Sequence, residues 1–174
     1  MKKGLLIINT GDGKGKSTAA LGILLRAWGR GMRVGMFQFL KSGAADYGEY
    51  QAAQKLGIEI ASLGDGCSWE SKDWEVSREV NLAAWEKVKE KITSGGYDVL
   101  VLDEFTFLMH FGWLDAAETV RWILENKPPS LHLIITGRYA PQELISAADL
   151  VTEMLEVKHH YKEQGLTSVP GIDR

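Results

Sequence analysis

The segment that most constrains this chain of 174 residues is 4–18, which reads GLLIINTGDGKGKST. Its apolar half, residues 5–8, is typical of a buried strand, and its glycine-rich half leads into a helix near Lys16. Glycines let a backbone curl so that successive N–H groups point at one anion, and the start of a helix adds its positive dipole end. The pattern therefore predicts a phosphate-binding loop between a first strand and a first helix.

The predicted loop has one irregularity. The usual pattern, G-x-x-x-x-G-K-[ST], has glycine where this chain has Thr10, and the glycines are shifted by one position along the loop. In such a loop Lys16 reaches the outer phosphates, Ser17 ligates Mg²⁺, and Lys14 lies within the loop. The strand before the loop and the helix after it argue against the alternative, a glycine-rich turn that holds no ligand.

Two acids, Asp103 and Glu104, end a continuous apolar run at 99–102 that is typical of a central strand. P-loop enzymes place a carboxylate beside the first strand, where it holds Mg²⁺ directly or through water, and a second acid there can orient a nucleophile. Acids at a strand end also serve as helix caps. The pair therefore supports a nucleotide site only in combination with the loop.

Arg26 and Arg138 are further candidates for contact with phosphate charge. Arg26 lies on a helix that is apolar almost all round, so the helix is expected to be buried against a sheet. A charge in such a place needs an anionic partner, which is either a ligand or a structural ion pair. Lys41 is interpreted as a solvated loop residue.

Apolar runs alternate with helical patterns along the whole chain, without a repeat or a change of composition. This alternation predicts a single doubly wound α/β domain over 1–174, P-loop NTPase-like (RecA-like), with a mostly parallel sheet and an irregular tail at 158–174. Ligands of such sheets bind at the carboxyl ends of the strands. Strands are expected at 5–8, 33–39, 58–61, 98–104, 131–136 and 150–157, and the longest helix at 70–94.

Composition excludes several classes of protein. Twenty basic and 23 acidic side chains give a net charge of −3, which does not favour nucleic acid as a partner. No stretch approaches the roughly 20 apolar residues of a membrane span, and the apolar run after Lys3 is too short for a signal peptide. The single cysteine forms no disulfide within the chain. A soluble, cytoplasmic protein is expected.

The sequence resembles the P-loop-type ATP:corrinoid adenosyltransferases over nearly its whole length. The resemblance implies transfer of the 5′-deoxyadenosyl group of ATP to the Co(I) of a reduced corrinoid, with triphosphate as the leaving group. Co(I) is itself the nucleophile, so the protein needs none. The segments that carry the resemblance are TGDGKGKSTAALG (10–22), VGMFQFLK (34–41), GDGCSWE (64–70), VLVLDEFTFLM (99–109), IITGRYAP (134–141), ADLVTEM (148–154) and the VKHHY…GID ending (157–173).

Matched by position, the resemblance implies that Ser17 and Glu104 serve Mg²⁺ and that Arg26 contacts the nucleotide. Lys16, Glu104 and Trp69 form the expected catalytic set. The residues expected around the nucleotide and its phosphates are Thr10, Gly11, Asp12, Gly13, Lys14, Gly15, Lys16, Ser17, Thr18 and Arg138.

The resemblance also bears on the corrinoid. The family removes the lower axial ligand of cobalt by packing apolar side chains beneath it, which eases the reduction of Co(II). Trp69 matches one aromatic residue of that segment, whereas Cys67 stands where the family carries another. We hypothesise that Cys67 packs as a small hydrophobe and that Phe105 or Trp113 covers the gap. The resemblance further implies a homodimer and an electron-donating reductase, such as a flavodoxin or a flavoprotein.

Two other functions stay open as alternatives. A different P-loop enzyme, a small-molecule kinase or ATPase, would release ADP and could use Asp103 or Glu104 as a base. A non-catalytic carrier would bind nucleotide or corrinoid without turnover. The ITGR and ADLVTEM blocks argue against the first alternative, and the intact Lys16, Ser17 and Glu104 argue against the second.

Overall fold

The structure is a computed structural model that describes residues 3–42, 47–66, 74–165 and 169–172. Within these ranges six strands form one sheet in the order β3-β2-β4-β5-β1-β6, and every neighbouring pair is parallel. The predicted doubly wound, parallel α/β fold is confirmed. The strands are β1 (Leu6–Thr10), β2 (Val34–Ser42), β3 (Glu59–Gly64), β4 (Val99–Asp103), β5 (His132–Thr136) and β6 (Leu150–Glu153).

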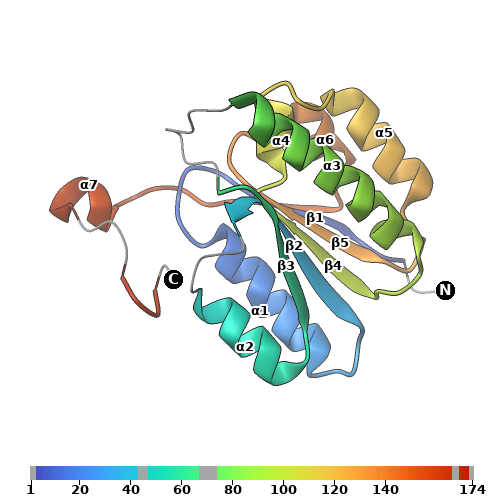
Figure 1. Cartoon of the computed structure of the whole chain (residues 1–174), viewed down its shortest axis with the longest axis horizontal. Coiled ribbons are helices and arrows are strands. Elements are labelled where there is room, and N and C mark those ends of the chain that lie inside the picture. Colours follow the sequence, from blue (N-terminus) through green and yellow to red (C-terminus); the bar gives the residue numbers. More distant parts are fainter. Residues whose placement is uncertain (1–2, 43–46, 67–73, 166–168, 173–174) are drawn as a thin grey trace.

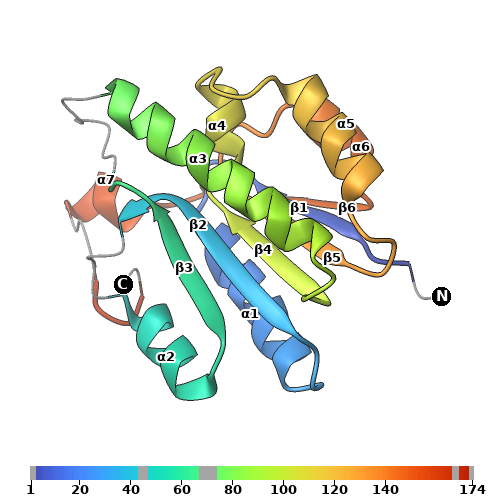
Figure 2. The same ribbon diagram turned by 45° about the vertical axis from the view of Figure 1, so that its right-hand side comes forward.

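Helices cover both faces of the sheet (Figure 1). The turned view in Figure 2 shows the same two layers of helices, and in Figure 1 α7 stands away from them. The first face carries α1 (Lys16–Trp28) and α2 (Gly48–Leu56), the second carries α3 (Trp74–Thr93), α4 (Thr106–His110), α5 (Ala116–Asn126) and α6 (Gln142–Ala147), and α7 is His160–Gln164.

The central strands are apolar on both sides because helices bury both faces of the sheet. In β4, Leu100 and Leu102 join the core beneath α3, while Val99 and Val101 join the core beneath α1. Successive side chains of a strand point to opposite faces, so one continuous apolar run supplies both cores. The same alternation directs the last residue of β4, Asp103, to the α1 face.

The first helix is buried against the sheet, as predicted, but only one of its faces is covered although it is apolar almost all round. Its inner face buries Ala20, Leu24 and Ala27, whereas Leu25 is 52% exposed and Trp28 is 39% exposed. The helix is outermost on its side of the sheet, so only the stripe at three- to four-residue spacing is covered. No helix in the described ranges is long and apolar enough to cross a membrane.

The C-terminal part also differs from expectation. β6 ends at Glu153 rather than near residue 157, and the tail that was expected to be irregular contains α7. Tertiary pairing with β1 sets the length of β6, because its register stops where Thr10 meets Glu153. α3 ends at Thr93, one residue before the predicted end of the helix 70–94, and the predicted start at 70–73 lies outside the described ranges.

Candidate nucleotide-binding site

The phosphate loop leaves the sheet one residue later than the usual pattern. Thr10 is still part of β1, where it pairs with Glu153, and its carbonyl accepts the N–H of Met154 at 2.8 Å. A residue held in the sheet in this way keeps an extended backbone, so the turn begins at Gly11. The longer strand accounts for threonine where glycine is usual and for the shifted glycines.

The loop lies directly against the segment that follows β6. The N–H of Gly13 donates to the carbonyl of Met154 at 2.7 Å. A Cβ on Gly13 would lie 2.7 Å from the carbonyl oxygens of Met154 and Leu155, closer than real Cβ atoms approach. Gly13 is therefore required by close approach rather than by a left-handed backbone, which in this loop only Gly11 and Gly15 adopt.

Lys16 places its ammonium group inside the loop. Nζ donates to the carbonyl oxygens of Gly11 at 2.8 Å and Gly13 at 2.7 Å. Burial lowers the pKa of Lys16, and the negative charge of Glu104 opposes that shift. The loop thus holds a desolvated cation that a phosphate oxygen would neutralise.

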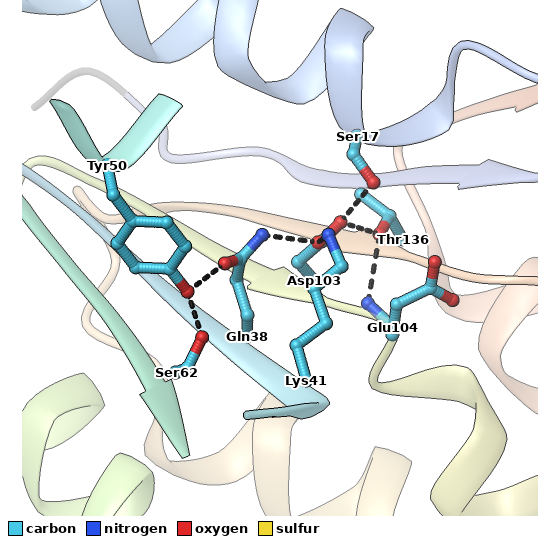
Figure 3. A network of polar contacts seen from close by, with 8 residues as sticks. All are labelled: Ser17, Gln38, Lys41, Tyr50, Ser62, Asp103, Glu104 and Thr136. Carbon is cyan, nitrogen blue, oxygen red and sulfur yellow. Dashed lines mark hydrogen bonds and ion pairs between the residues drawn. The ribbon is translucent and has the colours of Figure 1, made fainter. Parts of the chain in front are cut away.

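Asp103 is the centre of the polar network on the α1 face (Figure 3). Its carboxylate is fully buried and accepts four hydrogen bonds. Burial alone would raise the pKa of Asp103, but the charge of Lys41 and the donated hydrogen bonds outweigh it, so the pKa is lowered. The donors are Ser17 Oγ (2.6 Å) and Thr136 Oγ1 (2.6 Å) at Oδ1, and Gln38 Nε2 (2.9 Å) and Lys41 Nζ (3.0 Å) at Oδ2.

The sheet order corrects one prediction about these acids. The strand that ends in Asp103 does not lie beside β1, because β5 is inserted between them. Thr136, at the end of β5, bridges the gap: it donates to Asp103 and accepts the N–H of Glu104 at 3.1 Å. The pairing of strands remote in sequence, which no local pattern reveals, decides this arrangement.

Glu104 is half-buried, and one of its carboxylate oxygens is fully buried. Its Oε2 atom has no hydrogen-bond partner among the residues that the structure describes. Burial, followed by the charge of Asp103, raises the pKa of Glu104, and the cations Lys41, Lys16 and Arg138 oppose that shift. Its backbone has φ +60°, an uncommon conformation for a residue other than glycine. A strained residue with an unpaired buried oxygen beside cations is typical of a ligand site.

Lys41 and Gln38 are site residues that the sequence analysis missed. Lys41 is not a solvated loop residue: it belongs to β2, its side chain is 23% exposed, and it forms an ion pair with Asp103. Burial would lower the pKa of Lys41, but Asp103 outweighs it and the pKa is raised. The sequence feature that could have revealed this part of the site is Gln38, a polar residue inside an otherwise apolar strand. The Oε1 atom of Gln38 accepts a hydrogen bond from Tyr50, which also contacts Ser62.

Arg138 lies at the same rim as the loop. It follows β5, is half-buried, and lies near enough for its charge to affect both Lys16 and Glu104. It also lines a cavity of about 450 Å³ beside the loop, together with the predicted site residue Asp12. The other lining residues are Tyr139, Glu153, Met154, Leu155, Glu156 and Lys162.

The structure does not bring Arg26 to the loop. Arg26 is exposed in the last turn of α1, nine residues beyond Ser17. At 1.5 Å per residue these residues are about 14 Å apart along the helix axis. The structure therefore places Arg26 away from the phosphate loop, and its contact with the nucleotide stays a prediction.

The residues expected near the corrinoid are only partly described. Cys67 and Trp69 lie outside the described residues. Phe105 is fully buried between Phe39 and Trp85, with ring centroids 5.0 and 4.7 Å away. Because Cys67 lies outside the described residues, the hypothesis that Phe105 covers the gap there stays a prediction. Trp113 contacts Trp74, with centroids 4.9 Å apart, and Trp74 is the first described residue after 67–73.

The fold and the loop define a nucleotide-binding protein of the P-loop class. Its fold is similar to that of the flagellar accessory protein FlaH from Methanocaldococcus jannaschii, with a TM-score of 0.62 over 88% of this chain and 72% of that chain. At 11% identity this likeness concerns the fold alone.

The chain belongs to the CobA/CobO/BtuR family, because the family model described as ATP:corrinoid adenosyltransferase BtuR/CobO/CobP matches residues 2–173. A corrinoid adenosyltransferase of Sinorhizobium sp. is 40% identical, over 99% of this chain and 81% of that protein. The corrinoid adenosyltransferase CobA of Salmonella typhimurium is 34% identical, over 99% and 86% respectively. The corresponding protein of Pseudomonas aeruginosa is 35% identical, over 99% and 84%.

Proposed function

We propose that this protein is an ATP:corrinoid adenosyltransferase, which moves the 5′-deoxyadenosyl group of ATP to the Co(I) of a reduced corrinoid and releases triphosphate. Membership of the family over residues 2–173 supports the reaction. The observation that carries the nucleotide-binding part of this proposal is Glu104, whose buried Oε2 has no partner within the described part of the chain and lies next to Lys16 and the phosphate loop. The assignment of a corrinoid as the second substrate rests on membership of the family alone.

The residues of the site fit a magnesium ion. Mg²⁺ prefers oxygen ligands and is usually bound by one or two protein groups together with substrate phosphates. Glu104 offers an unpaired carboxylate oxygen, and Ser17 offers hydroxyl lone pairs next to the loop. We infer that these two residues would hold Mg²⁺, which supplies positive charge at the triphosphate.

The loop and Lys16 act on the leaving group. In the transfer the C5′–O bond breaks, a cobalt–carbon bond forms with the electron pair of Co(I), and triphosphate leaves with the electrons of the broken bond. Fixed N–H groups, Lys16 and Arg138 neutralise the charge that develops on triphosphate. The loop also fixes the position of C5′, so that attack can occur in line.

The state of Asp103 argues against the form of the kinase alternative in which Asp103 is the base. Phosphoryl transfer to a hydroxyl requires a residue that accepts or orients the proton of the nucleophile. Asp103 is fully buried and both of its oxygens already accept two hydrogen bonds each. Attack by Co(I) needs no proton acceptor, so a site in which Asp103 only positions its neighbours is sufficient.

We infer that Trp69 lies beneath the corrinoid and that Cys67 packs there as a small apolar side chain, with Trp113 next to them. The contact of Trp113 with Trp74 supports its part, because Trp74 follows the segment 67–73 directly. We also infer a homodimer, an electron-donating reductase such as a flavodoxin or flavoprotein, and a cytoplasmic location. The family resemblance supports these three, and a single cysteine fits a reducing compartment.

The test is an anaerobic reaction of the protein with Mg-ATP and chemically reduced cob(I)alamin. We expect loss of the Co(I) absorption band, a light-sensitive adenosylcobalamin product and one triphosphate per product. ADP or orthophosphate with persistent Co(I) would identify a kinase or ATPase instead. Binding of both ligands without turnover would identify a carrier.

The same system tests the corrinoid contacts by electron paramagnetic resonance of Co(II) bound with Mg-ATP. Trp69→Ala should reduce the four-coordinate fraction, and Cys67→Phe should change it. A fraction unchanged in Cys67→Phe would count against any role for that position.

A further inference from the structure

The strand β2 is irregular at Leu40. Its register with β3 pairs Gln38 with Ser62, and the next pair is Ser42 with Gly64, so β2 advances by four residues while β3 advances by two. Leu40 has φ +62°, a left-handed conformation that is unfavourable for leucine. Bulges of this kind re-aim side chains and are common beside active sites.

Two residues from neighbouring elements hold the bulge. Asn81 of α3 is fully buried, and its Oδ1 accepts the N–H of Leu40 at 3.0 Å. The amide of Asn81 is itself fixed, because its Nδ2 donates to the carbonyl of Ser77 at 2.8 Å. On the other side a Cβ on Gly64 would lie 2.5 Å from the backbone of Leu40, so only glycine lets β3 pass the bulge.

The bulge has a direct effect on Lys41. In a regular strand, residues three apart point to opposite faces of the sheet. Gln38 and Lys41 are three apart, yet both donate to Oδ2 of Asp103, at 2.9 and 3.0 Å. Without the bulge Lys41 would share the face of Phe37 and Phe39, which lies in the apolar core under α3.

Lys41 in turn completes the environment of Asp103 and, through it, of Ser17. With two donors on Oδ2 and Thr136 on Oδ1, Asp103 acts purely as an acceptor, and the Ser17 hydroxyl donates to it at 2.6 Å. A hydroxyl that donates in one fixed direction turns its lone pairs the other way. Figure 3 shows the Oγ of Ser17 directed at Asp103, so its lone pairs are turned away from that carboxylate.

We propose that Asn81 and Lys41 are positioning residues of the nucleotide site: Asn81 holds the bulge at Leu40, the bulge turns Lys41 onto Asp103, and Asp103 orients the hydroxyl of Ser17. The inference rests on the proposed nucleotide site and is independent of the corrinoid reaction. It links the N-terminal half of α3 to the loop over four side chains from different elements.

The test measures the dissociation constant for ATP by calorimetry, with Mg²⁺ and with EDTA, and the melting temperature of each ligand-free variant. Lys41→Met should weaken ATP binding in Mg²⁺ about tenfold, as expected for loss of a charge-assisted hydrogen bond. Lys41→Arg should retain most of the affinity. In EDTA the loss should be smaller, because the lone pairs of Ser17 matter most when a cation is present.

The matched control is Lys89→Met. Lys89 has a similarly exposed side chain (25%) and an ion pair with Glu86. It lies on α3 eight residues beyond Asn81, and neither Lys89 nor Glu86 takes part in the bulge or in the network around Asp103. It should bind ATP like the wild type. Equal losses for Lys41→Met in Mg²⁺ and EDTA would show that Lys41 acts only as a nearby charge, which would overturn the proposal.

A double-mutant cycle tests the role of Asn81. Asn81→Ala should weaken ATP binding, and Asn81→Ala/Lys41→Met should bind no more weakly than Lys41→Met, because Asn81 acts through Lys41. Losses that multiply, or a folded Lys41→Met protein with wild-type affinity, would overturn the inference. If the cycle behaves as expected but the wild type forms no adenosylcorrinoid, the proposed function fails and this inference stands.

Discussion

The hydroxyl of Ser17 lies 2.6 Å from the carboxylate of Asp103, although Ser17 lies in the first turn of the helix after β1 and Asp103 ends a strand that is not a neighbour of β1. The hydrogen bond crosses over the end of β5, where Thr136 supports the same carboxylate oxygen at 2.6 Å. This relationship joins the phosphate loop to the centre of the sheet. The position of the loop is therefore fixed by contacts with the ends of β4 and β5 as well as by its own strand, β1.

Asp103→Asn should destabilise the protein and weaken ATP binding. The substitution removes the charge that pairs with Lys41 and leaves an amide N–H group facing other donors. Breaking a fully buried pair costs about 3–5 kcal/mol, and we expect about 2–3 kcal/mol here because Lys41 keeps some solvent contact. Urea denaturation of the ligand-free protein measures the change. A wild-type midpoint would show that the network does not stabilise the fold.

Glu104→Gln should have opposite effects on stability and activity. Glu104 is half-buried, and its buried Oε2 has no hydrogen-bond partner among the described residues and lies next to the charge of Asp103, so a neutral side chain should stabilise the ligand-free protein by about 1 kcal/mol. Adenosyl transfer should be lost with the proposed magnesium ligand. Thermal denaturation and the anaerobic assay measure the two effects, with the exposed Glu79→Gln as a control that should change neither. Retained activity would contradict the assignment of Glu104.

Gly13→Ala should damage the loop, whereas Gly22→Ala should stabilise the protein. The added Cβ at Gly13 meets the backbone of Met154 and Leu155 at 2.7 Å, while the one at Gly22, in α1, meets nothing within 4 Å. Overpacking at the first site should cost about 1–3 kcal/mol and most of the ATP affinity. The helix propensity of alanine at the second should contribute about 1 kcal/mol. Similar effects of the two substitutions would contradict this account.

Asp98→Asn should lower stability in a pH-dependent way. Hydrogen bonds from the Arg33 guanidinium and backbone hold the pKa of Asp98 below 3.8, its ordinary value. A carboxyl with a lowered pKa in the folded state contributes stability above its unfolded pKa and loses it as the pH falls through the folded pKa. The difference in melting temperature between wild type and variant should therefore be full at pH 7 and shrink below pH 4. A difference that stays constant down to pH 3 would contradict the pairing.

Local sequence patterns, taken in order along the chain, were sufficient to predict the central strands, the phosphate loop and the fold class. Apolar runs placed the central strands because a strand covered on both faces must be apolar at every position, as β4 is at 99–102. The glycine spacing and Lys16-Ser17 marked the loop, since such a turn depends on neighbouring residues only. The family membership rests on the same linear blocks, which is why it could be inferred before the fold was known.

Only the tertiary structure decided which side chains meet. Lys41 was mistaken for a solvated residue because its partner is 62 positions away and the bulge that turns it inward depends on Asn81 and Gly64. The insertion of β5 between the loop strand and β4, and the exposure of Arg26, likewise depend on how strands pair and on which face of α1 is covered. A local sequence pattern specifies the conformation of its own segment, but contacts between distant segments follow from the packing of the whole chain.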